Sequence, residues 1–355
     1  MGILERTYAP EVGPAVDEAL ISADSHVIEP QGLWKENLPK AFRDRAPNLG
    51  GARRNDAPGG MNKSERVNEM ARDGVSAEVL YPTHGLKTLV LGDRDLEEAC
   101  VRVYNDWLAD YCSAAADRLI GLGLLSTYRI EAAIEEMERC RKAGMSGVVV
   151  WQVPAPELPF TSRHYDPLWA RAQDLDMPVS LHILSGHGYN LRQAFGEGDR
   201  GIEQERTSVN LKLVYAMDAL YDFIFSGVLE RFPRLKLVLV ENEIGWLPFI
   251  LEQWDYYYQR HGRDRTSLDL TMLPSEYFNR QVYATFFNDA VGGRLLSWWG
   301  ADNCMWSSDY PHGNSTWPDS RRIVARDMGA LPVDVRAKLL RDNVAKLYRI
   351  GSIGA

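Results

Sequence analysis

Cysteine is scarce in this sequence, and its spacing excludes several classes of protein. The 355 residues include four cysteines, Cys100, Cys112, Cys140 and Cys304. No two of them form a Cys-x-x-Cys pair, so neither a disulfide framework nor a cysteine-based zinc site is expected. Also missing are any run of 18 or more apolar residues and a charged start followed by an apolar stretch. We therefore expect no membrane span and no secretory signal, and the expected location is the cytoplasm.

Positive charge is also in short supply. Forty Lys and Arg residues stand against 49 Asp and Glu residues, which gives a net charge of −9. Because nucleic acids and anionic membranes require a basic face on their partners, neither is expected to bind. The 45% of apolar residues is ordinary for a globular protein with a large core. We expect a small-molecule substrate as the partner, and the sequence leaves a homodimer open.

Short apolar segments alternate with amphipathic ones along most of the chain. After an N-terminal arm, 1–18, strands are predicted at 19–26, 76–82, 119–126, 147–151, 177–183, 235–243, 282–287 and 304–310. Helices are predicted at 95–118, 131–142, 165–175, 207–231, 245–258 and 333–350, with a partly helical insertion at 31–75.

The predicted fold class is α/β. Eight strands with helices between them predict one (β/α)₈ TIM-barrel domain over residues 19–355, with a helical insertion after strand one and a C-terminal helix. An open doubly wound sheet is the alternative, but no Gly-x-Gly-x-x-Gly motif follows the first strand.

Side chains that suit a metal ion end four of the predicted strands. Asp24 and His26 share one face of the first strand, because side chains alternate along a strand. His182 ends the fifth strand, Glu241 the sixth and Asp309 the eighth. In a barrel these strand ends meet at one mouth, where carboxylates and imidazoles can hold Zn²⁺ or Mn²⁺. We expect one divalent ion, with Zn²⁺ favoured and Mn²⁺ as the alternative.

Four motifs carry a resemblance to a known family. They are DSHVIEP at 24–30, LHI at 181–183, WSSDYPH at 306–312 and DNVAKLY at 342–348. The chain resembles the amidohydrolase-related superfamily of metal-dependent TIM-barrel enzymes, in the branch of aminocarboxymuconate-semialdehyde decarboxylase. The resemblance implies a (β/α)₈ barrel with one divalent metal held by Asp24, His26, His182 and Asp309.

The sixth predicted strand departs from the family, whose members usually carry a His there. Here Glu241 stands in that place, and Glu243 shares its strand face by the period of two, so either side chain could reach the mouth. A carboxylate about 4 Å from an anionic substrate costs about 4 kcal/mol at an effective dielectric near 20. This cost favours hydrolysis over decarboxylation. Whether Glu241 is a metal ligand or an acid–base group stays open.

The leading prediction is therefore a metal-dependent hydrolase that uses a metal-activated water. Its expected catalytic residues are Asp309 and Glu241 as acid–base groups and His312 as a donor to the leaving group or to a substrate oxygen. A non-oxidative decarboxylase of an aromatic or muconate-like acid is the alternative. A non-catalytic ligand-binding barrel is the second alternative.

Aromatic residues near the predicted strand ends suggest a flat, aromatic or cyclic substrate. Tyr81, Trp151 and Trp246 are the candidates to line its pocket. Arg192, Arg206 or Arg280 could pair with a substrate carboxylate, and the sequence does not choose among them.

Overall fold

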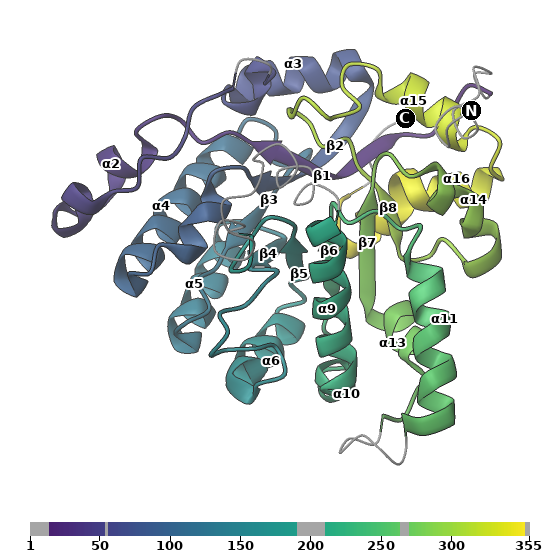
Figure 1. Ribbon diagram of the computed structural model, residues 1–355. Helices are drawn as coiled ribbons and strands as arrows, with labels where there is room; N and C mark the ends of the chain where they lie inside the picture. The colour runs from purple at the N-terminus through teal and green to yellow at the C-terminus, as the bar shows by residue number, and fades with distance from the viewer. Residues whose placement is uncertain (1–13, 54–55, 190–209, 263–269, 352–355) are drawn as a thin grey trace, which may run out of the picture.

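Eight parallel strands follow one another around a barrel in chain order (Figure 1). The computed structural model describes residues 14–53, 56–189, 210–262 and 270–351. The strands are β1 (Leu20–Val27), β2 (Val75–Pro82), β3 (Leu119–Leu124), β4 (Gly147–Val150), β5 (Val179–His182), β6 (Leu237–Val240), β7 (Val282–Phe286) and β8 (Cys304–Trp306). Each strand pairs in parallel with the next, and every residue of β4 and of β6 is buried. The predicted (β/α)₈ barrel is confirmed, and its strands are apolar because helices cover their outer faces.

The barrel closes between β1 and the segment that follows β8. The backbone N–H of Asp309 donates to the carbonyl of Asp24 at 3.0 Å, and the N–H of His26 donates to the carbonyl of Tyr310. The predicted eighth strand, 304–310, is thus too long, because β8 ends at Trp306 and Asp309 adopts a left-handed backbone with φ 55°. The turn still runs alongside β1 and completes the closure.

Helices surround the barrel (Figure 1). They are α3 (Lys63–Asp73), α4 (Arg94–Cys112), α5 (Ile130–Lys142), α6 (Asp166–Asp174), α9 (Lys212–Phe225), α10 (Val228–Arg231), α11 (Leu247–Tyr257), α13 (Pro274–Gln281), α14 (Ala290–Trp299) and α15 (Ser320–Met328). The insertion after β1 contributes α2 (Leu33–Asn37) and the short turns η1 (Lys40–Arg45) and η2 (Pro58–Gly60). Further short turns are η3 (Gly85–Val90) and η4 (Arg163–Tyr165), and π-helical η6 (Tyr258–Gly262) extends α11.

In two places, the periodicity of the sequence did not predict the helices correctly. The predicted helix 207–231 is broken at Gly227, whose φ of 74° ends one helix and begins the next, and residues 207–209 lie outside the described part. Helix α14 has no counterpart in the prediction, since its two adjacent glycines disfavour a helix. The Asp289 side chain caps it by accepting the N–H of Gly292 at 2.7 Å.

The C-terminal segment packs against the start of the barrel. The predicted single helix 333–350 consists of α16 (Val333–Ala337), the π-helical turn η7 (Lys338–Asp342) and α17 (Asn343–Tyr348). The amide of Asn343 donates to the carbonyls of Ala301 and Cys304 at 2.6 and 2.7 Å. Arg336 pairs with Glu18 at 2.9 Å, so the described end of the predicted N-terminal arm is held by this segment.

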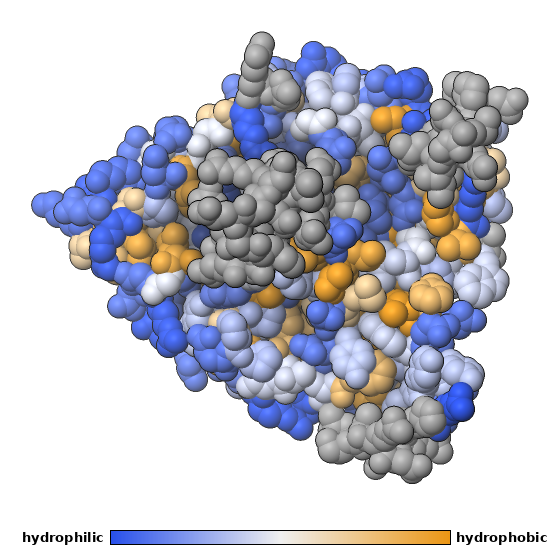
Figure 2. All heavy atoms as spheres, viewed as in Figure 1, coloured by the Kyte–Doolittle hydropathy of each residue, from blue (hydrophilic) through white to orange (hydrophobic). Residues whose placement is uncertain are grey.

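One face of the molecule is largely hydrophilic (Figure 2). On the face in Figure 2, hydrophilic side chains dominate and hydrophobic ones are scattered among them. Within the described ranges, every helix is too short or too polar to cross a membrane.

The packing of the C-terminal segment predicts that it cannot be removed. Truncation after Gly329 deletes five buried apolar side chains, Leu339, Leu340, Val344, Leu347 and Tyr348. At about 1.5–3 kcal/mol for each, this loss is comparable with the entire stability of a typical domain, about 5–15 kcal/mol. We expect insoluble or unfolded protein by circular dichroism, whereas truncation after Ile350 should leave a folded control. A stable 1–329 fragment would instead identify a separable C-terminal element.

Candidate metal centre

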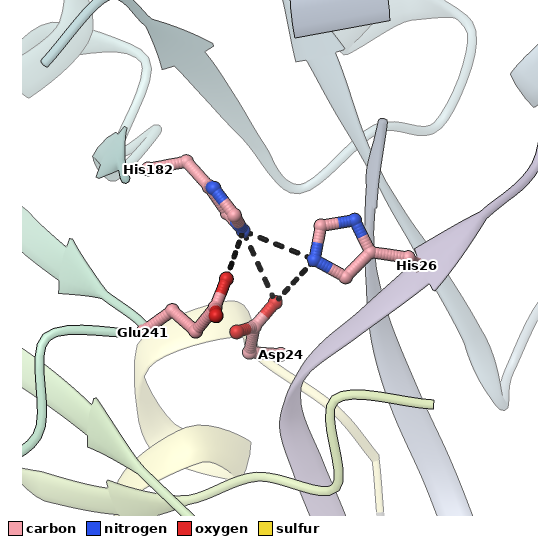
Figure 3. A group of neighbouring side chains, drawn as sticks. All are labelled: Asp24, His26, His182 and Glu241. Carbon is pink, nitrogen blue, oxygen red and sulfur yellow. Dashed lines mark hydrogen bonds and ion pairs between the residues drawn. The ribbon is translucent and has the colours of Figure 1, made fainter. Parts of the chain in front are cut away.

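Two strands bring an aspartate and two histidines together inside the mouth of the barrel (Figure 3). Asp24 and His26 lie on β1, and His26 Nε2 is 3.6 Å from Asp24 Oδ1, as the alternation of side chains predicts. His182 ends β5, and its Nε2 lies 3.7 Å from the same carboxylate oxygen and 3.1 Å from His26 Nε2. All three side chains are buried.

Backbone carbonyls set the orientation of both imidazole rings. His26 Nδ1 lies 3.1 Å from the carbonyl oxygen of Pro82, and His182 Nδ1 lies 2.8 Å from that of Ile183. Because a carbonyl only accepts, each Nδ1 carries the hydrogen in the neutral ring and each Nε2 presents a lone pair. Two lone pairs facing each other at 3.1 Å repel, and a cation between them removes the repulsion. Metal-binding histidines are typically held in this way.

The buried carboxylates of Asp24 and Asp309 also have oxygens available to bind a cation. Both carboxylate oxygens of Asp24 lack a hydrogen-bond partner among the described residues, and so does Oδ1 of Asp309. Asp309 Oδ1 lies 3.6 Å from His26 Nε2. Burial raises the pKa of Asp24, and burial together with the charges of Glu241 and Asp24 raises the pKa of Asp309 well above its ordinary value. This donor set of imidazoles and unpartnered carboxylates fits a divalent metal ion.

Glu241 enters the centre from the residue immediately after β6. Its left-handed backbone, with φ 63°, is held by its N–H bond to Thr285 Oγ1 at 2.8 Å. Glu241 Oε2 lies 3.8 Å from His182 Nε2, and Oε1 lies 3.0 Å from the ammonium of Lys212. Glu241 therefore belongs, with Asp24, His26 and His182, to a group of side chains that could hold a metal ion (Figure 3).

The expectation that Glu241 and Glu243 share a strand face is wrong. Strand β6 ends at Val240, and both glutamates have positive φ, so the period of two no longer applies. Glu243 accepts the N–H of Phe287 at 3.3 Å. Burial and the neighbouring Asp289 raise the pKa of Glu243 to about 8.

His312 lies beside the centre in the turn after β8. Its ring centroid is 4.4 Å from that of His26, and the two histidines form a second possible ligand group with Asp309. Burial lowers the pKa of His312 to about 4, so its ring is neutral at pH 7.

Comparison with known proteins agrees with the motifs. The amidohydrolase family model matches residues 37–350. The chain belongs to the amidohydrolase family. A γ-resorcylate decarboxylase of Rhizobium sp. is 25% identical over 314 residues, which cover 76% of this chain and 85% of the relative.

Solved structures of other proteins share the fold of this chain. An amidohydrolase from Mycobacterium avium subsp. paratuberculosis has a TM-score of 0.78 at 22% identity, and the match covers 94% of this chain and all of that one. A dihydroxybenzoic acid decarboxylase from Polaromonas sp., solved with manganese and the inhibitor 2-nitroresorcinol, has a TM-score of 0.66 at 21% identity, with 94% and 98% covered.

A cavity of about 450 Å³ adjoins the metal centre of this amidohydrolase-family chain on the side of Glu241. Its residues are Lys212, Leu213, Glu241, Asn242, Glu243, Gly245, Trp246, Phe287, Asn288, Asp289, Val291 and Asn314. The larger cavity, about 620 Å³, lies at the opposite end of the barrel, and none of the candidate site residues line it.

The three predicted pocket aromatics occupy different environments. Trp246 lines the cavity next to the centre, whereas Tyr81 and Trp151 do not. Tyr81 is buried with its ring 5.3 Å from that of His182, and its hydroxyl contacts Ser180 Oγ at 3.0 Å. Trp151 is buried against Tyr128. Tyr81 thus packs beside the imidazole of His182. Of the three predicted aromatics, Trp246 is the one that can contact a molecule in this cavity.

Lys212 is the residue that sequence reasoning missed. It lies at the start of α9 and pairs with Glu241, which is 29 residues further along the chain, so no local motif identified it. Of the three predicted arginines, Arg280 donates to the carbonyl of Leu229 on the outside of the barrel. Arg192 and Arg206 lie outside the described residues.

The first test of the centre is metal content. His26→Ala and His182→Ala should each remove most of about one equivalent of divalent metal, because each deletes an oriented nitrogen ligand. His164→Ala is the matched control, since His164 bonds the carbonyl of Thr127 away from the centre. Elemental analysis of the purified variants measures the loss, and full retention by both site variants would contradict the assignment.

The second test uses pH. Burial lowers the pKa of His182, but Asp24 and Glu241 outweigh it, and the net shift is upward from 6.5. Protons therefore compete with the metal for His182 at pH values below the pKa of this residue, which lies above 6.5. Metal affinity should rise as the pH increases toward that pKa. We expect a change of about tenfold or more per pH unit on the acidic side, measured by competition with a chelator. An affinity that does not vary between about pH 5.5 and 8 would exclude His182 as a ligand.

Proposed function

We propose that this protein is a manganese-dependent, non-oxidative decarboxylase of a small aromatic acid. Its curated relative is a decarboxylase, and a solved decarboxylase of the same fold holds manganese. The observation in this chain that answers the objection to decarboxylation raised from the sequence is the ion pair between Lys212 and Glu241, at 3.0 Å.

This ion pair removes the electrostatic argument against decarboxylation. That argument treated Glu241 as an isolated negative charge that would repel a substrate carboxylate. The ammonium of Lys212 offsets the charge, and both side chains are largely shielded from solvent, which strengthens their interaction. An anionic substrate can therefore approach the centre without the full cost of repulsion.

In the proposed site, Asp24, His26 and His182 hold the metal, with Glu241 and Asp309 as further carboxylate ligands. Zn²⁺ was expected from the ligand types, and Mn²⁺ is preferred here because carboxylates make up most of the donors. When bound, the ion would supply a Lewis acid that draws electron density from the substrate.

Residues of the chain must then deliver one proton to the substrate. Decarboxylation replaces the carbon–carbon bond to CO₂ with a carbon–hydrogen bond, so a proton must reach the ring carbon as CO₂ leaves. Asp309 is proposed to deliver it from the carboxylate oxygen that the metal leaves free, because its side chain is buried at the centre beside His26. His312, neutral and adjacent to His26, is proposed to hold a substrate oxygen in place.

The experiment follows CO₂ and ring products together. Manganese-loaded protein is given a panel of hydroxybenzoic acids, and amides and lactones in parallel. We expect CO₂ and the corresponding phenol, and Asp309→Asn should lower the rate by about 10²–10⁴-fold because it removes the proton donor.

Asp302→Asn is the matched control, because Asp302 is an exposed aspartate that pairs with Lys338 on the surface. Metal content is measured in every variant, so that a lost ligand is not mistaken for a lost proton donor. Hydrolysis of an amide or lactone with no CO₂ from any acid would restore the hydrolase prediction.

A further inference from the structure

Lys212 lies where the metal centre meets the 450 Å³ cavity. Its Nζ is 3.0 Å from Glu241 Oε1, and the other oxygen of Glu241 is 3.8 Å from His182 Nε2. One carboxylate therefore separates the ammonium from the centre. The Lys212 side chain is 22% exposed and lines the cavity, so a bound molecule can contact it.

Lys212 is the one cation among the described residues that line this cavity. The acidic groups there are bound to other partners. Asp289 accepts three backbone N–H bonds, and Glu243 accepts the N–H of Phe287. Glu241 is left with Lys212 and the metal centre. An anionic group of a ligand therefore finds its favourable contact at Lys212.

The remaining walls fit a flat ring. Trp246 and Phe287 supply aromatic surface, and Leu213 and Val291 supply aliphatic surface. The Trp246 ring is held in place because its Nε1 donates to the carbonyls of Asn242 and Glu243 at 2.9 and 3.1 Å. A fixed aromatic wall beside a single cation is suited to an aromatic ring that carries one negative group.

We propose that Lys212 determines substrate specificity by pairing with the carboxylate of an aromatic acid whose ring lies against Trp246 and Phe287. An ammonium has three N–H donors, so Lys212 can hold Glu241 and the substrate carboxylate together. The assignment deepens the proposed function and rests on it for the identity of the reacting group.

Benzoate and benzamide test this assignment, since they have nearly the same shape and differ in charge. Benzoate lacks the ring hydroxyl groups of the acids in the panel and serves as a binding probe. Calorimetry gives the Kd of each ligand for manganese-loaded parent, Lys212→Met, Lys212→Arg and the control Lys338→Met, which breaks a surface lysine–aspartate pair.

We expect Lys212→Met to weaken benzoate binding by roughly 10- to 100-fold and benzamide binding by about threefold or less, because one charge-assisted hydrogen bond is lost. Lys212→Arg should retain most of the benzoate affinity, and Lys338→Met should match the parent. Equal weakening of both ligands, no weakening of benzoate, or loss of manganese from Lys212→Met would overturn the proposal.

The double variant Lys212→Met/Glu241→Gln separates direct contact from charge masking. If Lys212 contacts the carboxylate, benzoate binding stays weak when Glu241 is also neutral and the double variant still holds manganese. Recovery of the parent affinity would overturn the proposal, because Lys212 would then only mask Glu241. Benzoate binding that depends on Lys212, in a protein that releases no CO₂ from any aromatic acid, would leave this assignment standing and remove the proposed function.

Discussion

The seam between β1 and the turn after β8 is the constraint on which the metal centre depends. Asp24 and His26 on one side and Asp309 on the other are linked by backbone hydrogen bonds across it, so these candidate ligands cannot shift independently. Arg66 lies beneath the seam, fully buried, and donates to the carbonyl of His26 at 2.6 Å while its guanidinium stacks 4.3 Å from the ring of Tyr310. The buried guanidinium of Arg66 thus contacts the backbone of His26 and the ring of Tyr310, the residue that follows Asp309.

Burying Arg66 requires its charge to be compensated, and Glu78 does so at 2.5 Å. Glu78 in turn accepts from Ser25 at 3.3 Å, and Ser25 contacts Ser308 at 3.0 Å, so polar side chains bridge β2, β1 and the turn after β8. A buried ion pair gives little net stability, but loss of one partner is costly. We infer that the Arg66–Glu78 pair holds the candidate ligands on β1 and after β8 in one arrangement.

Regular backbone explains why part of this site could be predicted, whereas Glu241 and Asp309 reach the centre from left-handed residues just beyond their strands. The period of two placed Asp24 and His26 together, and the convergence of strand ends brought His182 to them. Glu243 was misplaced because the left-handed residues after β6 break that period. Lys212 was not found because its contact with Glu241 depends on how a helix packs against the barrel, which no local pattern encodes.

The balance of charge links these features to the proposed reaction. If Asp24, Glu241 and Asp309 are all ionised, they contribute three negative charges, and Lys212 with a divalent ion contributes three positive ones. The centre is then neutral, which a buried site requires. An aromatic carboxylate adds one negative charge, and a proton on Asp309 compensates for it. That proton is the one that decarboxylation consumes at the ring carbon. In the proposed reaction, binding of the anionic substrate and protonation of Asp309 would thus be coupled, and the charge balance that suits a divalent ion would also provide the proton for the ring carbon.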